Sequence, residues 1–330
     1  MGSGRGGGTP TIRDVARLAS VSPQTVSRVL NTPEKVKEPT LTRVLDSIAQ
    51  LGYRRNPVAW GLATQRSGAI GVIDSGSGIL GQGLLLTAIE AAARDKGHSP
   101  RVTVIGPGSS TSMSRAYQLL RDEMVEGFII LGNTTLEVRE ALAFSGGAPT
   151  VLAASDEKAF GSVSTVAADQ AGGAELMIEH LRKRGPRIGM ISGPEGWLDA
   201  ESRLKVWRRD APEPRAELLQ FGDWSAESGY AAMNRLLEVG VDSVFSANDQ
   251  MALGALWACV QAGRRVPHDI AVGGYDDAPG AGFFNPPLTT VRQPFLDVGT
   301  EAVTLLDELI RNEPARTVVL PTELIVRESA

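Results

Sequence analysis

The sequence predicts a small all-α helix-turn-helix head joined to an α/β body of two doubly wound parallel-sheet subdomains. Three observations support this fold class. Apolar residues recur at helical spacing over residues 12–51, with one short break. An Asn-Pro segment follows at residue 56, and from residue 68 short apolar β runs alternate with helical patterns. A chain of 330 residues with 42% hydrophobic residues can form two or three such domains.

Two short helices over residues 11–31 form the predicted helix-turn-helix. Ser22 can cap the second helix, and Pro23 suits a first helical position, where no N–H is needed. The apolar sides contain Ile12, Val15, Ala16, Ala19, Val26, Val29 and Leu30, and the outward side of the second helix contains Gln24, Thr25, Ser27 and Arg28. Gln can pair with adenine and Arg with guanine, while Ser and Thr suit phosphates. This face could therefore bind DNA, or it could simply meet solvent.

A third helix completes the head, and a weak helix follows it. Pro39 begins the third helix, Gly52 ends it, and its apolar stripe contains Leu41, Val44, Leu45, Ile48 and Leu51. Asn56 can cap a short helix that begins at Pro57. A helix of about nine residues does not form alone in water, and Gly61 costs roughly 1 kcal/mol more relative to Ala. The segment therefore needs a partner to become helical, or it is a plain interdomain linker.

The body alternates β runs with helices, which is typical of parallel sheets. The first half has predicted strands at residues 69–74, 101–105, 127–131 and 149–154, and the second at 187–192, 216–221, 243–247 and 270–275. Two such halves facing each other form a cleft, the arrangement of periplasmic-binding-protein type. In such sheets ligands bind beyond the carboxyl ends of the strands.

Charge is unevenly distributed along the chain. Residues 1–66 contain ten Lys or Arg against four Asp or Glu, whereas the whole chain has a net charge of -5. A basic head on an acidic body indicates that only the head meets a polyanion such as DNA. The sequence has no apolar run of membrane-spanning length and no hydrophobic N-terminal leader, and Cys259 is its lone cysteine, so we expect a cytoplasmic protein.

Three patterns that could indicate a cofactor, a metal or catalysis are weak here. Gly76, Gly78 and Gly81 spell the dinucleotide-binding fingerprint, but the following strand ends without the acidic residue that would bind a ribose. Asp276 and Asp277 are adjacent, so in an extended run they point opposite ways. The histidines at 98, 180 and 268 lack ligand spacing. We therefore expect no cofactor, no metal and no enzymatic activity.

The residues that follow the predicted strands form a polar set with an aromatic member. The candidate ligand-binding residues are Ser75, Arg203, Trp224, Asn248, Asp276, Gln293 and Phe295. Planar hydrogen-bonding groups beside an aromatic platform suit the hydroxyl edges and C–H faces of a sugar. Phe295 could instead be simple core, and Asp249 could cap the helix that begins there.

The string from Asp14 to Asn31, DVARLASVSPQTVSRVLN, resembles the N-terminal signature of the lactose/galactose repressor (LacI/GalR) family of bacterial transcription regulators. The segments GDWSAESGY, SANDQMALGAL, GYDDAP and PPLTTVRQ resemble the C-terminal half of that family. The resemblance implies that residues 56–66 form a hinge helix whose Leu62 wedges into the DNA minor groove. The chain departs from the family pattern at three positions. Lys37 precedes the third helix, where the family often has a small hydroxyl residue. In the cleft, Leu80 stands where one member of the family has a histidine, and Ala154 stands where a carboxylate is usual. Pro23 occupies a base-reading position.

The resemblance also implies the domain limits and the DNA-binding residues. We expect a disordered arm over residues 1–10, a helix-turn-helix domain over 11–55, a hinge over 56–66 and an effector domain over 67–330. Its N-subdomain would comprise about 67–166 and 293–320, and its C-subdomain 167–292 and 321–330, with crossings near 166–169, 289–294 and 320–323. The DNA-binding residues would be Thr11, Ser22, Pro23, Gln24, Thr25, Ser27, Arg28, Asn31, Tyr53, Asn56, Leu62 and Ala63.

The function implied is a homodimeric regulator, expected to be a repressor of sugar-utilisation genes, that binds a pseudo-palindromic operator. A mono- or disaccharide in the cleft would control its affinity for the operator, with dimer contacts on the first helix after the hinge and near residues 250–263. A family member that responds to a purine or another non-sugar ligand, and a sugar-binding transport component, are the alternatives. The sequence leaves open whether the ligand is an inducer or a corepressor.

Overall fold

The computed structural model describes residues 10–53, 67–76, 80–106, 112–154 and 163–330. These residues fall into two compact units, divided between Ser67 and Gly68. The arm over residues 1–9 and the predicted hinge residues Asn56, Leu62 and Ala63 lie outside the described residues.

The described residues of the first unit, which we call the head, form three α-helices, α1 (Ile12–Leu18), α2 (Pro23–Asn31) and α3 (Glu38–Leu51), with a 3-10 turn η1 (Pro33–Lys35) before α3. Its core consists of Val15, Ala16, Ala19, Val26, Val29 and Val44. The Ser22 hydroxyl accepts a hydrogen bond from the Thr25 backbone N–H at 3.1 Å, and Gly52 ends α3 with φ 59°. The predicted start of α2 and the predicted end of α3 are therefore confirmed, whereas α3 begins at Glu38, one residue before the predicted Pro39.

Two details of α3 matter for its prediction. Leu45, expected in the apolar stripe, is 50% exposed, so that expectation was wrong. Among residues 10–53, α1 and α2 are the helices packed against α3, and the buried side of α3 is narrower than its apolar pattern. Lys37 occupies the N-cap position of α3 and makes no side-chain capping bond there.

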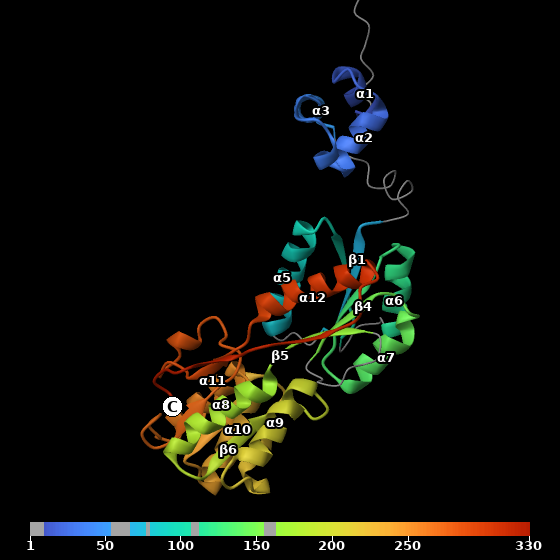
Figure 1. Cartoon of the computed structure of the whole chain (residues 1–330). Helices are drawn as coiled ribbons and strands as arrows, with labels where there is room; N and C mark the ends of the chain where they lie inside the picture. The colour runs from blue at the N-terminus through green and yellow to red at the C-terminus, as the bar shows by residue number, and fades with distance from the viewer. Residues whose placement is uncertain (1–9, 54–66, 77–79, 107–111, 155–162) are drawn as a thin grey trace, which may run out of the picture. The chain divides into compact units, whose positions relative to one another are not determined.

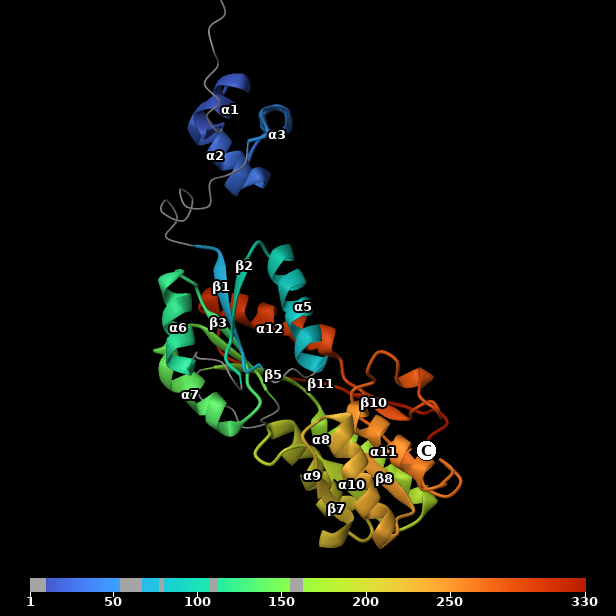
Figure 2. The same cartoon turned by 180° about the vertical axis from the view of Figure 1, so that it is seen from behind.

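The first half of the body, the N-lobe, is built on a six-stranded parallel sheet (Figures 1 and 2). Its order is β11 (Thr317–Leu320), β5 (Ser164–Ala168), β4 (Thr150–Ala153), β3 (Phe128–Leu131), β1 (Ala69–Asp74) and β2 (Ser99–Val104). Helices α5 (Leu80–Asp95) and α12 (Phe295–Ile310) cover one face, and α6 (Met113–Asp122) and α7 (Thr135–Ser145) cover the other.

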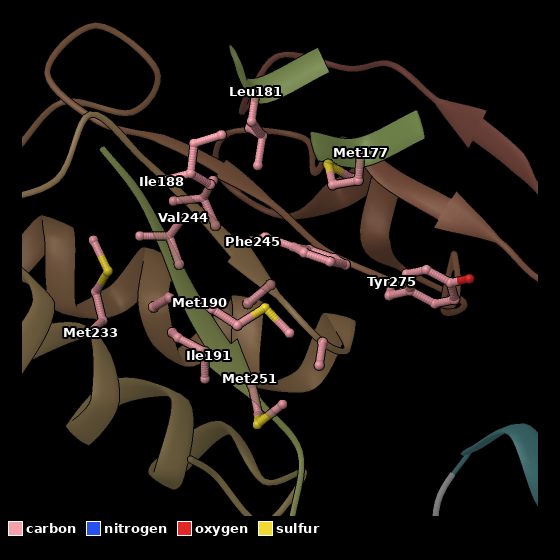
Figure 3. Close-up of a cluster of buried hydrophobic side chains, with 14 of the residues drawn as sticks. Met177, Leu181, Ile188, Met190, Ile191, Met233, Val244, Phe245, Met251 and Tyr275 are labelled. Carbon is pink, nitrogen blue, oxygen red and sulfur yellow. The ribbon is translucent and has the colours of Figure 1, made fainter. Parts of the chain in front are cut away.

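The second half, the C-lobe, has a four-stranded parallel sheet in the order β7 (Leu219–Phe221), β6 (Ile188–Ser192), β8 (Ser243–Ser246) and β9 (Ala271–Gly273). Its helices are α8 (Gln170–Leu181), α9 (Leu198–Asp210), α10 (Ala226–Val239) and α11 (Asp249–Gln261). Figure 3 shows part of its core, in which Met190, Val244 and Phe245 of the sheet lie beside Met177, Met233 and Met251 of the helices. The two doubly wound halves confirm the predicted fold class.

The predicted strand over residues 216–221 was wrong in its first half. Residues Ala216–Leu218 form a 3-10 turn, η3, because the Leu218 N–H donates to the Arg215 carbonyl oxygen at 3.0 Å. Pairing with β6 begins only at Leu219, opposite Met190.

The chain passes between the lobes after β5, between β10 (Thr290–Arg292) and α12, and between β11 and β12 (Glu323–Ile325). Strands β10 and β12 pair antiparallel beside these passages. Because the passages lie side by side, the carboxyl ends of the strands of both sheets are held around one space. None of the helices in the described residues is long and apolar enough to cross a membrane.

Candidate functional site

A cavity between the lobes contains about 760 Å³ of space free of protein atoms, including the part open to solvent. Six of the seven predicted ligand-binding side chains line it, namely Arg203, Trp224, Asn248, Asp276, Gln293 and Phe295. Sequence reasoning missed several further lining residues, which are Gln82, Asn133, Gln170, Trp197 and Asp199. The cavity therefore brings together residues that are far apart in the sequence.

Arg203 is the central charged group of the C-lobe side of the cavity. Its side chain is 2% exposed, and its Nε and Nη2 atoms donate to the Gln170 Oε1 atom at 2.9 and 2.7 Å. Its Nη1 atom donates to the Ala247 carbonyl oxygen. Its guanidinium carbon lies 3.8 Å from the centre of the Tyr275 ring, a cation–π contact that stabilises the charge. These contacts fix the guanidinium rigidly.

A chain of amide hydrogen bonds connects Arg203 to Asp276. The Gln170 Nε2 atom donates to Gln293 Oε1 at 2.7 Å, and the Gln293 Nε2 atom donates to Asp276 Oδ1 at 2.7 Å. Burial raises the pKa of the Asp276 carboxyl, although Arg203 and Gln293 oppose this shift. One carboxylate, one guanidinium and two amides therefore face the cavity with fixed orientations.

Asp276 and Asp277 point opposite ways, as the sequence predicted. Asp277 leaves the cavity and accepts hydrogen bonds from Arg292 at 2.8 Å and from Arg327 at 2.6 Å. The carboxyl group whose pKa is affected by the charge of Asp276 is that of Asp249, the first residue of α11. Burial, followed by the charge of Asp276, raises the pKa of Asp249 to about 8. Asp249 is structural, since it accepts hydrogen bonds from the Thr290 hydroxyl and the Ala278 N–H.

Two tryptophans form an aromatic corner in the cavity. The Trp197 and Trp224 rings meet edge to face with their centres 5.7 Å apart. Trp224 has a positive φ of 74°, and the Asn248 Nδ2 atom donates to its carbonyl oxygen at 3.1 Å. A Cβ atom on Gly193 would come within 2.2 Å of the Trp224 ring, so only glycine permits this ring position. Trp197 follows β6 as Trp224 follows β7, and the same strand-end rule would have found it.

Ser75 and Phe295 have supporting positions. Ser75 lies one layer behind the cavity, where its hydroxyl donates to the Leu131 carbonyl oxygen at 2.9 Å and accepts from Asn133. Phe295 begins α12 and lines the cavity, and its ring packs closely over Gly81 of α5. Both the core and the ligand-facing interpretation of Phe295 are therefore compatible with its position.

The candidate DNA-binding face of the head lies on α2. Pro23, Gln24 and Arg28 are exposed, and Thr25 and Ser27 are half-buried. The Ser22 and Thr25 hydroxyl oxygens lie 2.9 Å apart. At the ends of the head, the Thr11 hydroxyl donates to the Asp14 carboxylate at 2.6 Å, and half-buried Tyr53 packs on the core. Asn31 is the last residue of α2.

Comparison with known proteins matches both units. Residues 11–56 match the bacterial regulatory proteins of the lacI family, and residues 178–330 match the periplasmic binding protein-like domain. The chain is 34% identical over 331 residues to the lactose operon repressor of Escherichia coli (strain K12), a match that covers 97% of this chain and 90% of the repressor. The chain belongs to the lacI family.

Other members of the lacI family match along almost the whole chain. The ribose operon repressor of Halalkalibacterium halodurans is 32% identical, covering 97% of this chain and 96% of that protein. Among solved structures, the lac repressor dimer bound to operator and the anti-inducer ONPF has a TM-score of 0.80 at 31% identity, covering 98% of this chain and 99% of that one. A complex of the transcriptional regulator CelR with cellobiose has a TM-score of 0.73 at 32% identity, covering 97% and 100%.

Membership of the lacI family makes this chain a DNA-binding transcriptional regulator and not an enzyme. Within the described residues, Arg203, Gln170, Gln293 and Asp276 hold one another by hydrogen bonds in the cavity, as in a site built for binding. No group of three or more His, Cys, Asp or Glu side chains within those residues could hold a metal ion.

Proposed function

We propose that this lacI-family regulator is a cytoplasmic, homodimeric repressor whose affinity for a pseudo-palindromic operator is set by a small saccharide in the cavity between its lobes. The observation that carries the proposal is the cavity wall itself. Arg203, Asp276 and Gln293 offer fixed hydrogen-bonding groups, and Trp224 offers a ring face beside them. Sugars require this combination of hydroxyl partners and an apolar platform.

Trp224 contributes a polar group as well as a platform. Its indole N–H is buried and has no hydrogen-bond partner among the described residues. A buried donor without a partner costs free energy, which a ligand hydroxyl would recover if the indole turns its N–H into the cavity on binding. The complex of the relative CelR with cellobiose supports a saccharide ligand for this chain too.

On the DNA side, we assign base contacts to Gln24 and Arg28 and phosphate contacts to the hydroxyl residues Ser22, Thr25 and Ser27. Gln24 and Arg28 are exposed on the first two turns of α2, where side chains of a recognition helix reach base edges. The sequence segment that begins at Asn56 would couple this face to the cavity. A helix too short to form alone would form only when paired with its copy in the dimer on DNA. A ligand that changes the position of the lobes would bring the two segments together or separate them, and the affinity for the operator would change accordingly.

The test is a sugar panel in a thermal-shift assay with the full chain, repeated with operator DNA selected from random duplexes. The proposal expects one saccharide to stabilise the protein and to change the dissociation constant for the operator. Arg203→Lys should weaken the effect of the sugar, whereas Arg115→Lys, the same change at an exposed site on α6, serves as a control. A purine that shifts the transition while every sugar fails would overturn the saccharide assignment.

The DNA assignment has a separate test. Arg28→Ala should lower operator affinity and weaken the preference for one base pair, because an arginine fork reads a guanine. Arg115→Ala on α6, which removes an equal charge from an exposed site of the body, should leave operator affinity unchanged. Equal losses from both variants would show that α2 does not bind bases.

A further inference from the structure

The two lobes contribute opposite chemistry to the cavity wall. All three charged side chains of the described lining, Asp199, Arg203 and Asp276, belong to the C-lobe. The amides of Gln170, Asn248 and Gln293 come from the residues next to them on the same side. Every charged group that the described lining offers to a ligand therefore lies on one side of the cavity.

The N-lobe side is apolar. Its described lining includes Leu85, Leu131, Ala153, Ala154, Val166 and Val298. Gln82 and Asn133 are the polar side chains of the described lining on this side, and they bind each other. The Gln82 Nε2 atom donates to Asn133 Oδ1 at 2.9 Å, while the Asn133 amide donates to Ser75 behind the wall.

Ala154 lies immediately beyond β4, at the strand end where a polar group could reach the cavity. It is buried, with 8% exposure, and its methyl group offers nothing to a hydroxyl. A hydroxyl pressed against such a wall would lose water without gaining a partner, which is costly in an apolar environment. A methyl, methylene or aryl group in the same place would gain from burial.

We infer that the effector is an amphiphilic saccharide: its hydroxylated part binds the C-lobe, and it presents a hydroxyl-free group to the N-lobe wall formed by Leu85, Leu131, Ala153, Ala154, Val166 and Val298. The inference rests on the proposed saccharide function and specifies its ligand class. A deoxy or pentose ring edge and an apolar aglycone are the two chemical sources of such a group.

Matched pairs of sugars test the inference by titration calorimetry on the full chain. The parents are D-glucose, D-galactose, cellobiose and lactose, and each is compared with its phenyl β-glycoside. The 6-deoxy forms of glucose and galactose, together with D-xylose, test the ring-edge source. We expect at least one phenyl glycoside, 6-deoxy sugar or D-xylose to bind tenfold or more tightly than its parent sugar, a difference in binding free energy of about 1.4 kcal/mol.

The outcomes separate the two proposals. If the parent sugars bind and none of their phenyl or deoxy derivatives binds more tightly, this inference is overturned and the saccharide function stands. Absence of binding by all the sugars would overturn the saccharide function and this inference with it. Preference for the phenyl glycosides or for the deoxy sugars identifies which source supplies the apolar group.

A substitution provides the reverse test. Ala154→Ser adds one hydroxyl to the N-lobe wall and should raise the affinity for a hydroxylated parent relative to its partner at least threefold. Ala92→Ser is the matched control, because Ala92 is also 8% exposed but lies on α5 outside the cavity lining. The result that contradicts the assigned role of this wall is an unchanged ratio of the two affinities in Ala154→Ser. The comparison requires that Ala154→Ser and Ala92→Ser have the same melting temperature.

Discussion

Replacement of Gly193 by alanine should remove the aromatic platform of the cavity without touching a polar group. Gly193 follows β6 and lies beneath the Trp224 ring. An added Cβ atom would lie 2.2 Å from Cη2, 2.3 Å from Cζ2 and 2.7 Å from Cζ3 of that ring. Carbon atoms in contact are about 3.5–4.0 Å apart, so the ring must move by more than about 1 Å.

The backbone of Trp224 cannot easily absorb this movement. The Asn248 side chain holds the Trp224 carbonyl oxygen, and the Asn248 Oδ1 atom in turn accepts the Met251 N–H at 2.8 Å as the N-cap of α11. The ring must therefore swing into the cavity. We expect the effector affinity of Gly193→Ala to fall about tenfold or more, and the protein to lose about 1–3 kcal/mol of stability through overpacking.

Titration calorimetry measures the first effect, and urea unfolding followed by tryptophan fluorescence measures the second. Gly282→Ala is the matched control, because a Cβ atom there would meet nothing closer than the Arg327 side chain at 3.5 Å, an ordinary contact distance. The double variant Gly193→Ala with Trp224→Leu should recover stability but not affinity. Unchanged effector binding in Gly193→Ala would refute the role of Trp224 as a platform.

Three further substitutions test the supporting structure. Ser22→Ala should speed hydrogen exchange in α2 by removing a cap of about 1 kcal/mol, while Ser22→Asp should preserve the cap. Trp207→Phe leaves the Ile188 carbonyl oxygen without its 2.9 Å donor and should cost about 1–3 kcal/mol in urea unfolding, against less than about 0.5 kcal/mol for Phe283→Leu at a 94% exposed site. Asp249, whose pKa is raised to about 8 in the folded state, favours folding when protonated, so its contribution is lost as pH rises from about 4 towards 8. Asp249→Asn should flatten that fall in the pH profile of the melting temperature, and an identical slope would contradict the assignment.

Sequence patterns predicted the head well because its features are local. A serine three residues before its N–H donor, a proline at the first helical position and a glycine after the last are sufficient to define α2 and α3. The error at Leu45 arose from a property that is not local. How much of the apolar side of α3 is buried depends on the number of helices packed against it, and in the described part of the head these are α1 and α2.

The cavity was predictable on its C-lobe side and much less so on its N-lobe side. Asn248 and Asp276 follow the apolar strands β8 and β9 closely in sequence, Arg203 lies further along, within the helix α9 that follows β6, and parallel strand ends gather at one edge. Gln170 was missed because β5 before it has the sequence STVAA, which lacks a marked apolar run. The pairing of Gln82 with Asn133 joins positions 51 residues apart, so no spacing rule could predict it.

A backbone hydrogen bond across the cavity makes closure of the lobes testable. The Leu198 N–H, at the first residue of α9 in the C-lobe, donates to the Asn133 carbonyl oxygen of the N-lobe at 2.8 Å. Leu198→Pro would delete this donor with little strain, because proline is tolerated at a first helical position and Trp197 before it is already extended, with φ -83° and ψ 126°. Leu198→Ala removes the same side-chain packing but retains the N–H.

If the closed lobes are the form that binds the effector, the proline variant should bind it about two- to tenfold more weakly than the alanine variant, since one such bond contributes about 0.5–1.5 kcal/mol. Equal affinities in the two variants would mean that the contact contributes nothing to closure.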